Sequence, residues 1–259
     1  TDTVPQFLEM MKLASLAKPV AGSRMAVFSS SGGDNGLAAD YCSFAGLELP
    51  QPGKAVVDVI KPMLPSYGHV SNPLDFTAGY WGNEKLLTPM FTAMLEGDVD
   101  AAMLVIEYPP SGRDTSAQEA MDRALAAAGK ASGKPVFHAS VNSGGITPEA
   151  SRAMIAQGIV PLQGLHDAAE VIAKWVRYGA RAQVGGDTVP PYSAAPLAGA
   201  PRGVNEAESK RRLAAHGLPV SAGRPLWRPI RLFDRLGDDR GGVDNPAVEG
   251  HRAGLSFRD

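Results

Sequence analysis

Short apolar runs alternate with longer segments of helical periodicity along the first 182 residues of the chain. The runs at 25–28, 101–106 and 135–139 are almost wholly apolar, as is typical of strands that a parallel sheet buries on both faces. Two shorter runs, at 47–50 and 159–160, predict two further strands. The pattern therefore predicts a sheet of about five strands.

The segments between these runs predict helices, because apolar residues recur in them three and four positions apart. Gly46 is expected to end the helix that follows the first strand, and Thr147 to cap a helix whose first residue is Pro148. Further helices are predicted at 5–17, 54–63, 83–96, 115–130, 148–157 and 165–182. The inward residues are expected to be Phe7, Leu8, Met11, Leu13 and Leu16 in the first of these, and Val171, Ile172, Trp175 and Val176 in the last.

Strands that alternate with helices imply right-handed βαβ units and a parallel sheet. The predicted fold class is α/β, a flavodoxin-like doubly wound parallel sheet of about five strands, followed by a linker and an incomplete C-terminal segment. The expected divisions are a helical lead-in at 1–24, the flavodoxin-like domain at 25–182, a Pro-, Gly- and Ala-rich linker at 183–202 and a last segment at 203–259.

The last segment begins with an amphipathic helix at 204–217, which Asn205 is expected to start and Gly217 to end. Residues 224–259 carry seven Arg and no Lys and show no sustained period. This composition predicts disorder or irregular packing.

Loops that follow the strands gather at the carboxyl edge of such a sheet, where ligands bind. The first of them, SSSGGDNG at 29–36, joins a strand to a helix that Asp34 or Asn35 is expected to cap. Backbone N–H groups and the positive end of the helix dipole meet there, which suits an anion and above all a phosphate. The expected phosphate-binding residues are Gly32, Gly33, Asn35 and Gly36. Secondary candidates from the other loops and strand ends are Asn72, Asp75, Ser111, Asn142, Gly144 and His138.

Other interpretations of the glycine turn remain open. Any doubly wound domain needs a tight turn here, so a purely structural role has equal weight. The spacing matches neither G-x-x-x-x-G-K-[ST] nor G-x-G-x-x-G, and the serines lack a G-x-S-x-G context, so ATP, a dinucleotide and a hydrolase nucleophile are not first choices. A flavin or small-phosphate binder is a third interpretation, weakened because no aromatic residue flanks the turn, although Tyr80 and Trp81 are not far along the chain.

Composition narrows the class of protein. An apolar fraction of 44% allows a sizeable core, and a net charge of −2 provides no field for nucleic acid or an anionic membrane. No apolar run is long enough to span a membrane and no signal peptide is visible, so a cytoplasmic location is expected. The chain opens on Thr1 without an initiator Met, which indicates a fragment or a processed chain.

Cysteine and histidine offer few catalytic candidates. Cys42 is the one cysteine and lies on an apolar helix face, so it is expected to fill the core. Among five histidines, His138 closes a strand near the ligand edge and is the best candidate for chemistry, with a hydrogen-bonded structural role as the alternative. No pair has metal-ligand spacing, so no metal is expected. The others are expected in a loop (His69), at a helix start (His166), in the C-terminal helix (His216) and in the tail (His251).

Three stretches in order, SSSGGDNGLAADYCSFAGLELP, SNPLDFT and AAMLVI, resemble the succinyl-CoA-synthetase-like flavodoxin domain of the NDP-forming acyl-CoA synthetases, such as ADP-forming acetate–CoA ligase. The resemblance covers about residues 20–182. Residues 204–220, VNEAESKRRLAAHGLPV, look like the opening helix and strand of the ATP-grasp domain that follows in fused members.

The resemblance implies acyl phosphate chemistry in which a phosphoryl group rides on a histidine and CoA accepts the acyl group. Two helix N-termini clamp the phosphohistidine in this family, so Gly32, Gly33 and Asn35 would supply N–H groups. ATP or ADP and CoA are the cofactors expected of the complete enzyme, with none bound tightly here. The expected partners are the CoA-binding and ATP-grasp domains or subunits of the same ligase, with no nucleic acid and no membrane.

The sequence also departs from the family pattern. Asp34 stands where members have a small neutral segment, and its carboxylate would repel a phosphoryl group unless it turns away as a cap. Asn72 and Asp75 match the family's N-P-x-D segment, with a turn held by Asx hydrogen bonds as the alternative.

Several expected parts of the family are missing from this sequence. The phosphorylated histidine and the CoA-binding domain would lie upstream of residue 25, the ATP-grasp domain stops after about one helix, and the Arg-rich tail fits a shifted reading frame or a remnant. We therefore expect no turnover by the chain alone. The alternative function is a non-catalytic interaction or anion-binding module, a remnant of such an enzyme, that forms a homodimer through its sheet edge or the helix at 5–17.

Overall fold

The computed structural model describes residues 1–17, 19–183 and 204–221. The chain divides into two compact units, Thr1–Pro191 and Tyr192–Asp259, and each is treated by itself. The predicted linker at 183–202 lies almost entirely outside the described residues. The predicted Arg-rich tail at 224–259, with His251, lies outside them as well.

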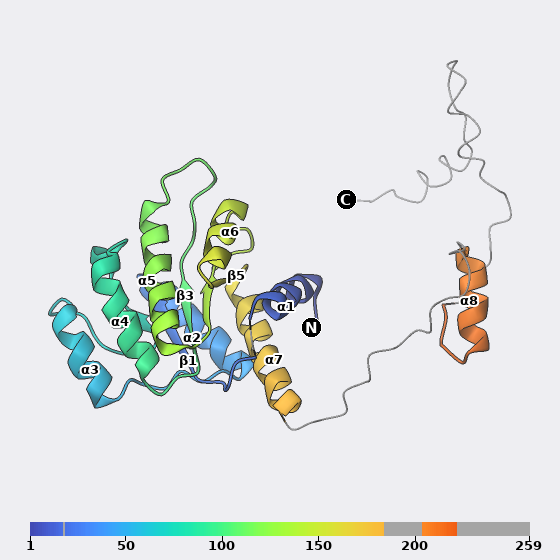
Figure 1. Cartoon of the computed structure of the whole chain (residues 1–259), viewed down its shortest axis with the longest axis horizontal. Helices are drawn as coiled ribbons and strands as arrows, with labels where there is room; N and C mark the ends of the chain where they lie inside the picture. The colour runs from blue at the N-terminus through green and yellow to red at the C-terminus, as the bar shows by residue number, and fades with distance from the viewer. Residues whose placement is uncertain (18, 184–203, 222–259) are drawn as a thin grey trace, which may run out of the picture. The chain divides into compact units, whose positions relative to one another are not determined.

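The first unit is built on a parallel sheet of five strands (Figure 1). Their order is β2-β1-β3-β4-β5, and each neighbouring pair runs parallel. This is the flavodoxin-like doubly wound order, so the predicted fold class is confirmed. The order reverses beside β1, which places the expected ligand crevice at the carboxyl ends of β1 and β3. The strands are β1 (Met25–Ser29), β2 (Leu74–Asp75), β3 (Ala101–Val105), β4 (Val136–Ala139) and β5 (Val160–Leu162).

One predicted strand is wrong. Residues 47–50 form only a single parallel bridge, between Arg24 and Glu48, whereas Leu74–Asp75, where no strand was predicted, supplies the edge strand β2. The Asn72 side chain explains this difference. It occupies hydrogen-bonding groups of β1 that residues of a neighbouring strand would otherwise bind. Its Oδ1 accepts the Val27 N–H at 3.0 Å, and its Nδ2 donates to the carbonyls of Met25 and Pro50 at 2.7 and 3.0 Å.

Helices cover both faces of the sheet (Figure 1). Strand residues alternate between two cores, with Phe28 and Leu104 facing one and Val27 and Met103 facing the other. The first core is closed by α3 (Lys54–Ile60), α4 (Glu84–Glu96), α5 (Ser116–Ser132) and α6 (Pro148–Ala156), and the second by α1 (Val4–Leu16), α2 (Gly32–Ala45) and α7 (Leu165–Gln183). Gly46 ends α2 in the left-handed conformation, and Thr147 caps α6 ahead of Pro148, as predicted.

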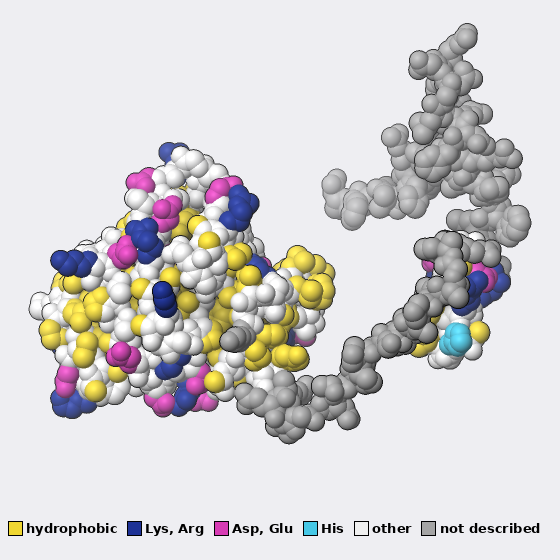
Figure 2. Space-filling view, viewed as in Figure 1, with side chains coloured by type: hydrophobic (Ala, Val, Ile, Leu, Met, Phe, Trp, Pro, Cys, Tyr) yellow, Lys and Arg dark blue, Asp and Glu magenta, His cyan; other side chains and the backbone are white. Residues whose placement is uncertain are grey.

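The predicted inner face of α1 is wrong at all but one position. Leu13 is buried as predicted, but Phe7, Leu8, Met11 and Leu16 are exposed, and the helix buries Gln6 and Glu9 in their place. Tertiary polar contacts decide this orientation, because Glu9 accepts the Gln163 N–H at 3.0 Å and Gln6 accepts a bond from Lys174 at 3.0 Å. Figure 2 shows the resulting hydrophobic side chains gathered over α1. Val171, Ile172 and Trp175 of α7 are buried as predicted.

The described part of the second unit is one helix, α8 (Glu206–Ala215). Asn205 caps it through a bond from the Glu208 N–H at 2.9 Å, and Gly217 follows with φ of 74°, as the sequence predicts. Within the described residues, no helix has the length and apolar character needed to cross a membrane.

Candidate functional site

Ser31 caps α2, so the prediction of Asp34 or Asn35 as the cap is wrong. Ser31 Oγ accepts the Asp34 N–H at 3.2 Å, and the Ser31 carbonyl accepts the Asn35 N–H at 3.0 Å. The spacing Ser31-x-x-Asp34 ahead of an apolar helix is a sequence signal for this cap. Asp34 is consequently a first-turn residue of α2, where the helix dipole favours its negative charge.

The first turn of α2 leaves two amides free. Among the described residues, the N–H groups of Gly32 and Gly33 have no acceptor. The N–H of Asn35 is already donated to Ser31, and that of Gly36 is directed at the Gly32 carbonyl by helix geometry. Of the four expected phosphate-binding residues, Gly32 and Gly33 alone retain backbone donors for a ligand.

The Asn35 side chain is the least satisfied polar group in the described core. It is 7% exposed, and neither Oδ1 nor Nδ2 has a hydrogen-bond partner. Asn35 lies on the buried face of α2 with Ala38 and Cys42, and helical side chains lean toward the N-terminus. A buried amide without partners costs on the order of 1–3 kcal/mol, so the group requires a physical reason.

Asp75 lies beside the same helix end. Its Oδ1 accepts the Thr77 N–H at 2.8 Å, while its Oδ2 has no donor among the described residues. Oδ2 would be 3.7 Å from a Cβ added to Gly32, which places the carboxylate against the first residue of α2. Thr77 itself has a φ of 65°, which is strained for a β-branched residue, and its buried Oγ1 has no partner.

A polar hollow of about 490 Å³ opens beside Asp75. Serine and threonine hydroxyls, one histidine and one carboxylate line it, and the histidine, His69, lies in a loop as predicted and is exposed. The lining residues are Ser30, Tyr67, Gly68, His69, Ser71, Asp75, Thr77, Ala78 and Gly79. Ser30 and Asp75 connect this hollow to the N-terminus of α2.

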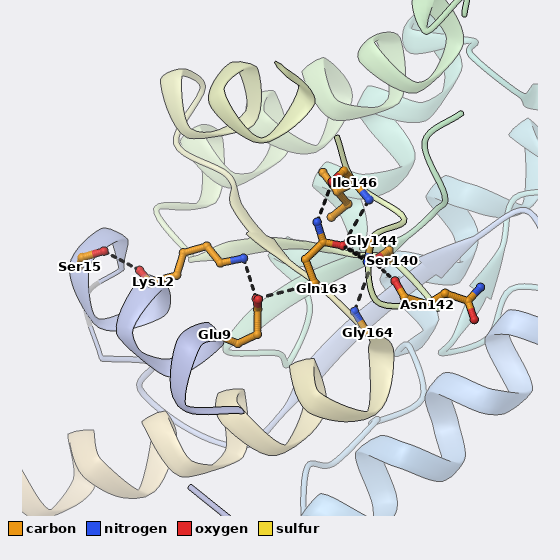
Figure 3. A network of polar contacts seen from close by, with 9 residues as sticks. All are labelled: Glu9, Lys12, Ser15, Ser140, Asn142, Gly144, Ile146, Gln163 and Gly164. Carbon is orange, nitrogen blue, oxygen red and sulfur yellow. Dashed lines mark hydrogen bonds and ion pairs between the residues drawn. The ribbon is translucent and has the colours of Figure 1, made fainter. Parts of the chain in front are cut away.

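The second glycine turn, at 140–146, is satisfied by the protein itself (Figure 3). Gln163 Oε1 accepts bonds from the N–H groups of Gly144 at 3.0 Å and Ile146 at 3.3 Å, and Gln163 Nε2 donates to the Ile146 carbonyl at 2.7 Å. Glu107 Oε1 accepts both the backbone and the side-chain N–H of Asn142, at 2.9 and 3.2 Å. Asn142 and Gly144, both secondary candidates, therefore have their donors occupied.

Gln163 is held in turn by α1. Glu9 Oε2 accepts the Gln163 N–H and pairs with Lys12 at 2.7 Å (Figure 3). Neither Gln163 nor Glu107 was predicted as part of a site, because both are far from the turn in sequence and no local motif marks them. Because these hydrogen bonds satisfy the turn at 140–146, the turn has a structural role.

Ser111 is also separated from the expected site. It is exposed, and its Oγ donates to Glu149 Oε2 of α6 at 3.3 Å. Asn72 is buried, and its side-chain atoms are committed to the strand contacts described above. Asn72 therefore has a structural role, but through contacts across the sheet edge, and the Asx turn given as the alternative forms at Asp75.

His138 is buried in a polar triad with Asp122 and Tyr108, and its ring nitrogens are not available to a ligand. Its Nδ1 lies 2.6 Å from Asp122 Oδ1, its Nε2 lies 2.9 Å from the Ile106 carbonyl, and Tyr108 donates to Asp122 Oδ2 at 2.5 Å. Both ring nitrogens face oxygen atoms that accept hydrogen bonds, and these contacts favour the protonated ring. Burial lowers the pKa of His138, but Asp122 and the Ile106 carbonyl outweigh it and raise that pKa above 6.5. The structural alternative for His138 is again the one the geometry supports.

Other reactive groups do not assemble a site. Cys42 is buried, and burial raises the pKa of its thiol to about 12, so it fills the core as predicted. No group of three or more potential metal-ligating side chains occurs among the described residues. The described unit therefore brings together Gly32, Gly33, Asn35 and Asp75 as its candidate anion site.

Comparison with known proteins points to one enzyme family, although no family model matches the sequence. A trans-feruloyl-CoA synthase from an unknown prokaryotic organism is 28% identical over 148 residues, 57% of this chain and 21% of the relative. The alpha subunit of ADP-forming acetate–CoA ligase II from Pyrococcus furiosus is 24% identical over 65% of this chain and 36% of its own. The ADP-forming acetate–CoA ligase II of Archaeoglobus fulgidus is 26% identical over 68% of this chain and 26% of its own.

Solved structures share the fold. A Pyrococcus horikoshii protein superposes with a TM-score of 0.59 at 22% identity, over 71% of this chain and 41% of that one. A dinucleotide-forming acetyl-coenzyme A synthetase of Candidatus Korarchaeum cryptofilum, in complex with phosphate and ADP, gives a TM-score of 0.55 at 21% identity over 71% of this chain and 39% of that one.

The sequence relatives confirm the resemblance to the NDP-forming acyl-CoA synthetases. The chain spans between 21% and 36% of the length of the curated relatives it matches. It is thus similar to one part of those longer enzymes.

Proposed function

We propose that this chain is the domain of an NDP-forming acyl-CoA synthetase in which the N-terminus of α2 receives the phosphoryl group of a phosphohistidine carried elsewhere in the enzyme. The observation that carries the proposal is the pair of unoccupied N–H groups on Gly32 and Gly33, at the carboxyl edge of the strand where the sheet order reverses. The resemblance to ligases that form acyl-CoA adds the chemical context.

The geometry suits a phosphoryl group without a dedicated cation. Two amides at a helix start point along the dipole, and such donors stabilise an oxyanion because they need no reorganisation when it arrives. In this proposal the chain binds and orients the phosphoryl group and does not turn over by itself. Nucleotide and CoA binding belong to the partner domains or subunits of the same ligase, with ATP or ADP and CoA as the cofactors of the complete enzyme.

Replacing Gly32 by proline is expected to weaken binding of a phosphohistidine analogue about 10-fold or more. Proline removes one amide donor, worth on the order of 1.5–3 kcal/mol when the acceptor is charged. Ser31 already has the extended backbone, with ψ of 119°, that a residue before proline adopts, and proline is favoured at the first helical position, so α2 is expected to persist. The measurement is calorimetric titration of the purified chain with 1-phosphoimidazole.

Gly32→Ala is the matched control. It keeps the N–H, and its Cβ would meet Asp75 Oδ2 at an ordinary 3.7 Å, so binding is expected to stay within about threefold of the parent chain, a difference below 1 kcal/mol. Equal binding by the proline and alanine variants, or no binding by the parent chain, would refute the proposal.

A second candidate, a non-catalytic interaction module, is favoured by the apolar stripe on α1. Val4, Phe7, Leu8 and Met11 are 52–72% exposed and recur at helical spacing. If the module forms a homodimer through this stripe, Phe7→Glu should shift sedimentation velocity from a dimer to a monomer, because a carboxylate is costly to bury in an apolar contact. A parent chain that sediments as a monomer up to about 100 μM, which corresponds to a dimerisation free energy weaker than roughly −5.5 kcal/mol, would exclude this homodimer.

A further inference from the structure

We infer that the polar hollow beside Asp75 is a binding site for the vicinal diol of a sugar, either free or as part of a nucleoside. This site is separate from the one in the proposed function, because neither Gly32 nor Gly33 lines the hollow. Several hydrogen-bonding side chains line this one cavity and have no partner among the described residues.

The hollow has the size and the position of a small-molecule site. Its volume of about 490 Å³ is ordinary for a ligand pocket. Residues from three separate segments line it, at 30, 67–71 and 75–79. The first and third of these segments meet at the carboxyl ends of β1 and β2, the edge at which open α/β sheets bind their ligands.

Free hydroxyl groups are the common feature of the lining. Among the described residues, the hydroxyls of Ser30, Tyr67 and Thr77 have no hydrogen-bond partner. The hydroxyl of Ser71 is the exception, because it donates to the Pro73 carbonyl at 2.9 Å. Each free hydroxyl can both donate and accept, so the lining matches a ligand whose own groups do both.

Thr77 is the independent observation that points to a ligand. Its φ of 65° is strained for a β-branched residue, and its Oγ1 is buried without a partner. A Cβ added to Gly79, which also lines the hollow, would lie 3.6 Å from that oxygen, so the hydroxyl is close to a second lining residue. Backbone strain and an unsatisfied hydroxyl are costly in a purely structural turn, and such strain clusters where proteins bind ligands.

Asp75 supplies the acceptor that selects a diol. Its Oδ1 accepts the Thr77 N–H at 2.8 Å, which fixes the carboxylate and leaves Oδ2 without a donor among the described residues. A carboxylate forms charge-assisted hydrogen bonds with hydroxyl donors, and these are about twice as strong as bonds between neutral groups. One hydroxyl of a diol can donate to Oδ2 while its neighbour bonds a serine or threonine of the lining.

The charge of the lining favours a neutral ligand. Asp75 supplies its one carboxylate, and neither lysine nor arginine lines the hollow. An anion in the hollow would be repelled by Asp75 with no such cation to offset the repulsion. The free amides of Gly32 and Gly33 offset it at the start of α2, where the helix dipole adds to them, but they do not reach the lining.

The test is a titration of the whole chain with D-ribose and with 2-deoxy-D-ribose, which lacks one hydroxyl of the diol. The backbone amide resonances of Thr77 and Gly79 report binding. Ribose is expected to half-saturate their shifts at a concentration about fivefold or more below that of deoxyribose, in line with the loss of one hydrogen bond. Equal half-saturation, or no saturable shift with either sugar, would overturn the inference.

Two variants test the assigned side chains. Asp75→Asn keeps an oxygen for the Thr77 N–H and replaces the other by an NH₂, which donates where the carboxylate accepts, so the preference for ribose is expected to fall to about twofold or less. Ser30→Ala removes a hydroxyl that has no partner among the described residues, so the fold is expected to persist while ribose binds about threefold more weakly.

Asp40→Asn is the matched control, because Asp40 is an exposed carboxylate on α2 and its loss changes the net charge as much as Asp75→Asn does. It should keep the preference for ribose. Parent-like binding and preference in both Asp75→Asn and Ser30→Ala would overturn the assignment of the site to this hollow.

Adenosine distinguishes the two sources of the diol. If the ligand is a nucleoside, adenosine should bind about tenfold or more tightly than ribose, because the base stacks on the Tyr67 ring, which is 78% exposed. Tyr67→Ala should then abolish the gain. Adenosine that binds no more tightly than ribose would assign the site to a free sugar. Both results support the diol site.

Discussion

Replacing Asp122 by asparagine is expected to lower the free energy of unfolding by about 3–5 kcal/mol, the cost of leaving a buried charge without its partner. Asp122 and His138 are 1% and 0% exposed, and Asp122 accepts from both His138 and Tyr108. Asparagine has one acceptor oxygen, so it satisfies one of these donors and turns its own NH₂ toward the other. Chemical denaturation in urea measures the loss.

Asp40→Asn controls for charge, because it removes an exposed carboxylate and is expected to change stability by at most about 0.5 kcal/mol. A loss in Asp122→Asn no larger than that of Asp40→Asn would contradict the buried ion pair.

The same pair predicts how stability depends on pH. Because the folded state raises the pKa of His138 above 6.5, the folded chain holds this proton more tightly than the unfolded chain does. Its contribution is fully present below the ordinary histidine pKa and is lost as the pH rises through the raised value. The difference in unfolding free energy between the parent chain and His138→Gln should therefore shrink as the pH rises through that window. A difference that grows with pH would contradict the assignment of an imidazolium.

Replacing Asn72 by alanine is expected to cost about 2–5 kcal/mol. The change removes one acceptor and two donor bonds, so it leaves the Val27 N–H and the carbonyls of Met25 and Pro50 without partners in or beside the core. Each unsatisfied buried group costs on the order of 1–3 kcal/mol, reduced where water enters. Unfolding in urea again gives the size of the effect.

Asn83→Ala is the matched control. Asn83 caps α4 through one bond from the Leu86 N–H at 3.2 Å, and losing such a cap costs about 1 kcal/mol. If Asn72→Ala costs no more than Asn83→Ala, the edge of the sheet does not depend on the Asn72 carboxamide.

The sequence was sufficient to predict a helix or strand where local conformational rules and the pattern of burial agree. The strand predicted at 25–28 and the stop at Gly46 follow from an apolar run and helix periodicity, and both lie where they were expected, whereas α2 begins at Gly32, earlier than the predicted cap at Asp34 or Asn35. Five strands were also predicted, but one was assigned to the wrong segment. A two-residue edge strand has too little pattern to detect, and the Asn72 side chain that anchors it acts across more than 40 residues.

Tertiary contacts account for the other errors. The pattern of α1 predicts that its apolar residues face inward, yet bonds to Gln163 and Lys174 turn Gln6 and Glu9 inward, which no local rule anticipates. In the site, the turns at 29–36 and 140–146 look alike in sequence. They differ because Gln163 and Glu107 occupy the donors of the second turn, whereas Gly32 and Gly33 in the first remain free.

That difference between the two turns is the central claim, and one measurement tests it most directly. Backbone amide resonances of the whole chain are followed during titration with 1-phosphoimidazole. We expect Gly32 and Gly33 to shift first and furthest, while Asn142 and Gly144 stay in place because Glu107 and Gln163 already hold them. Shifts centred on residues 140–146, or no saturable shift at Gly32 and Gly33, would contradict the account.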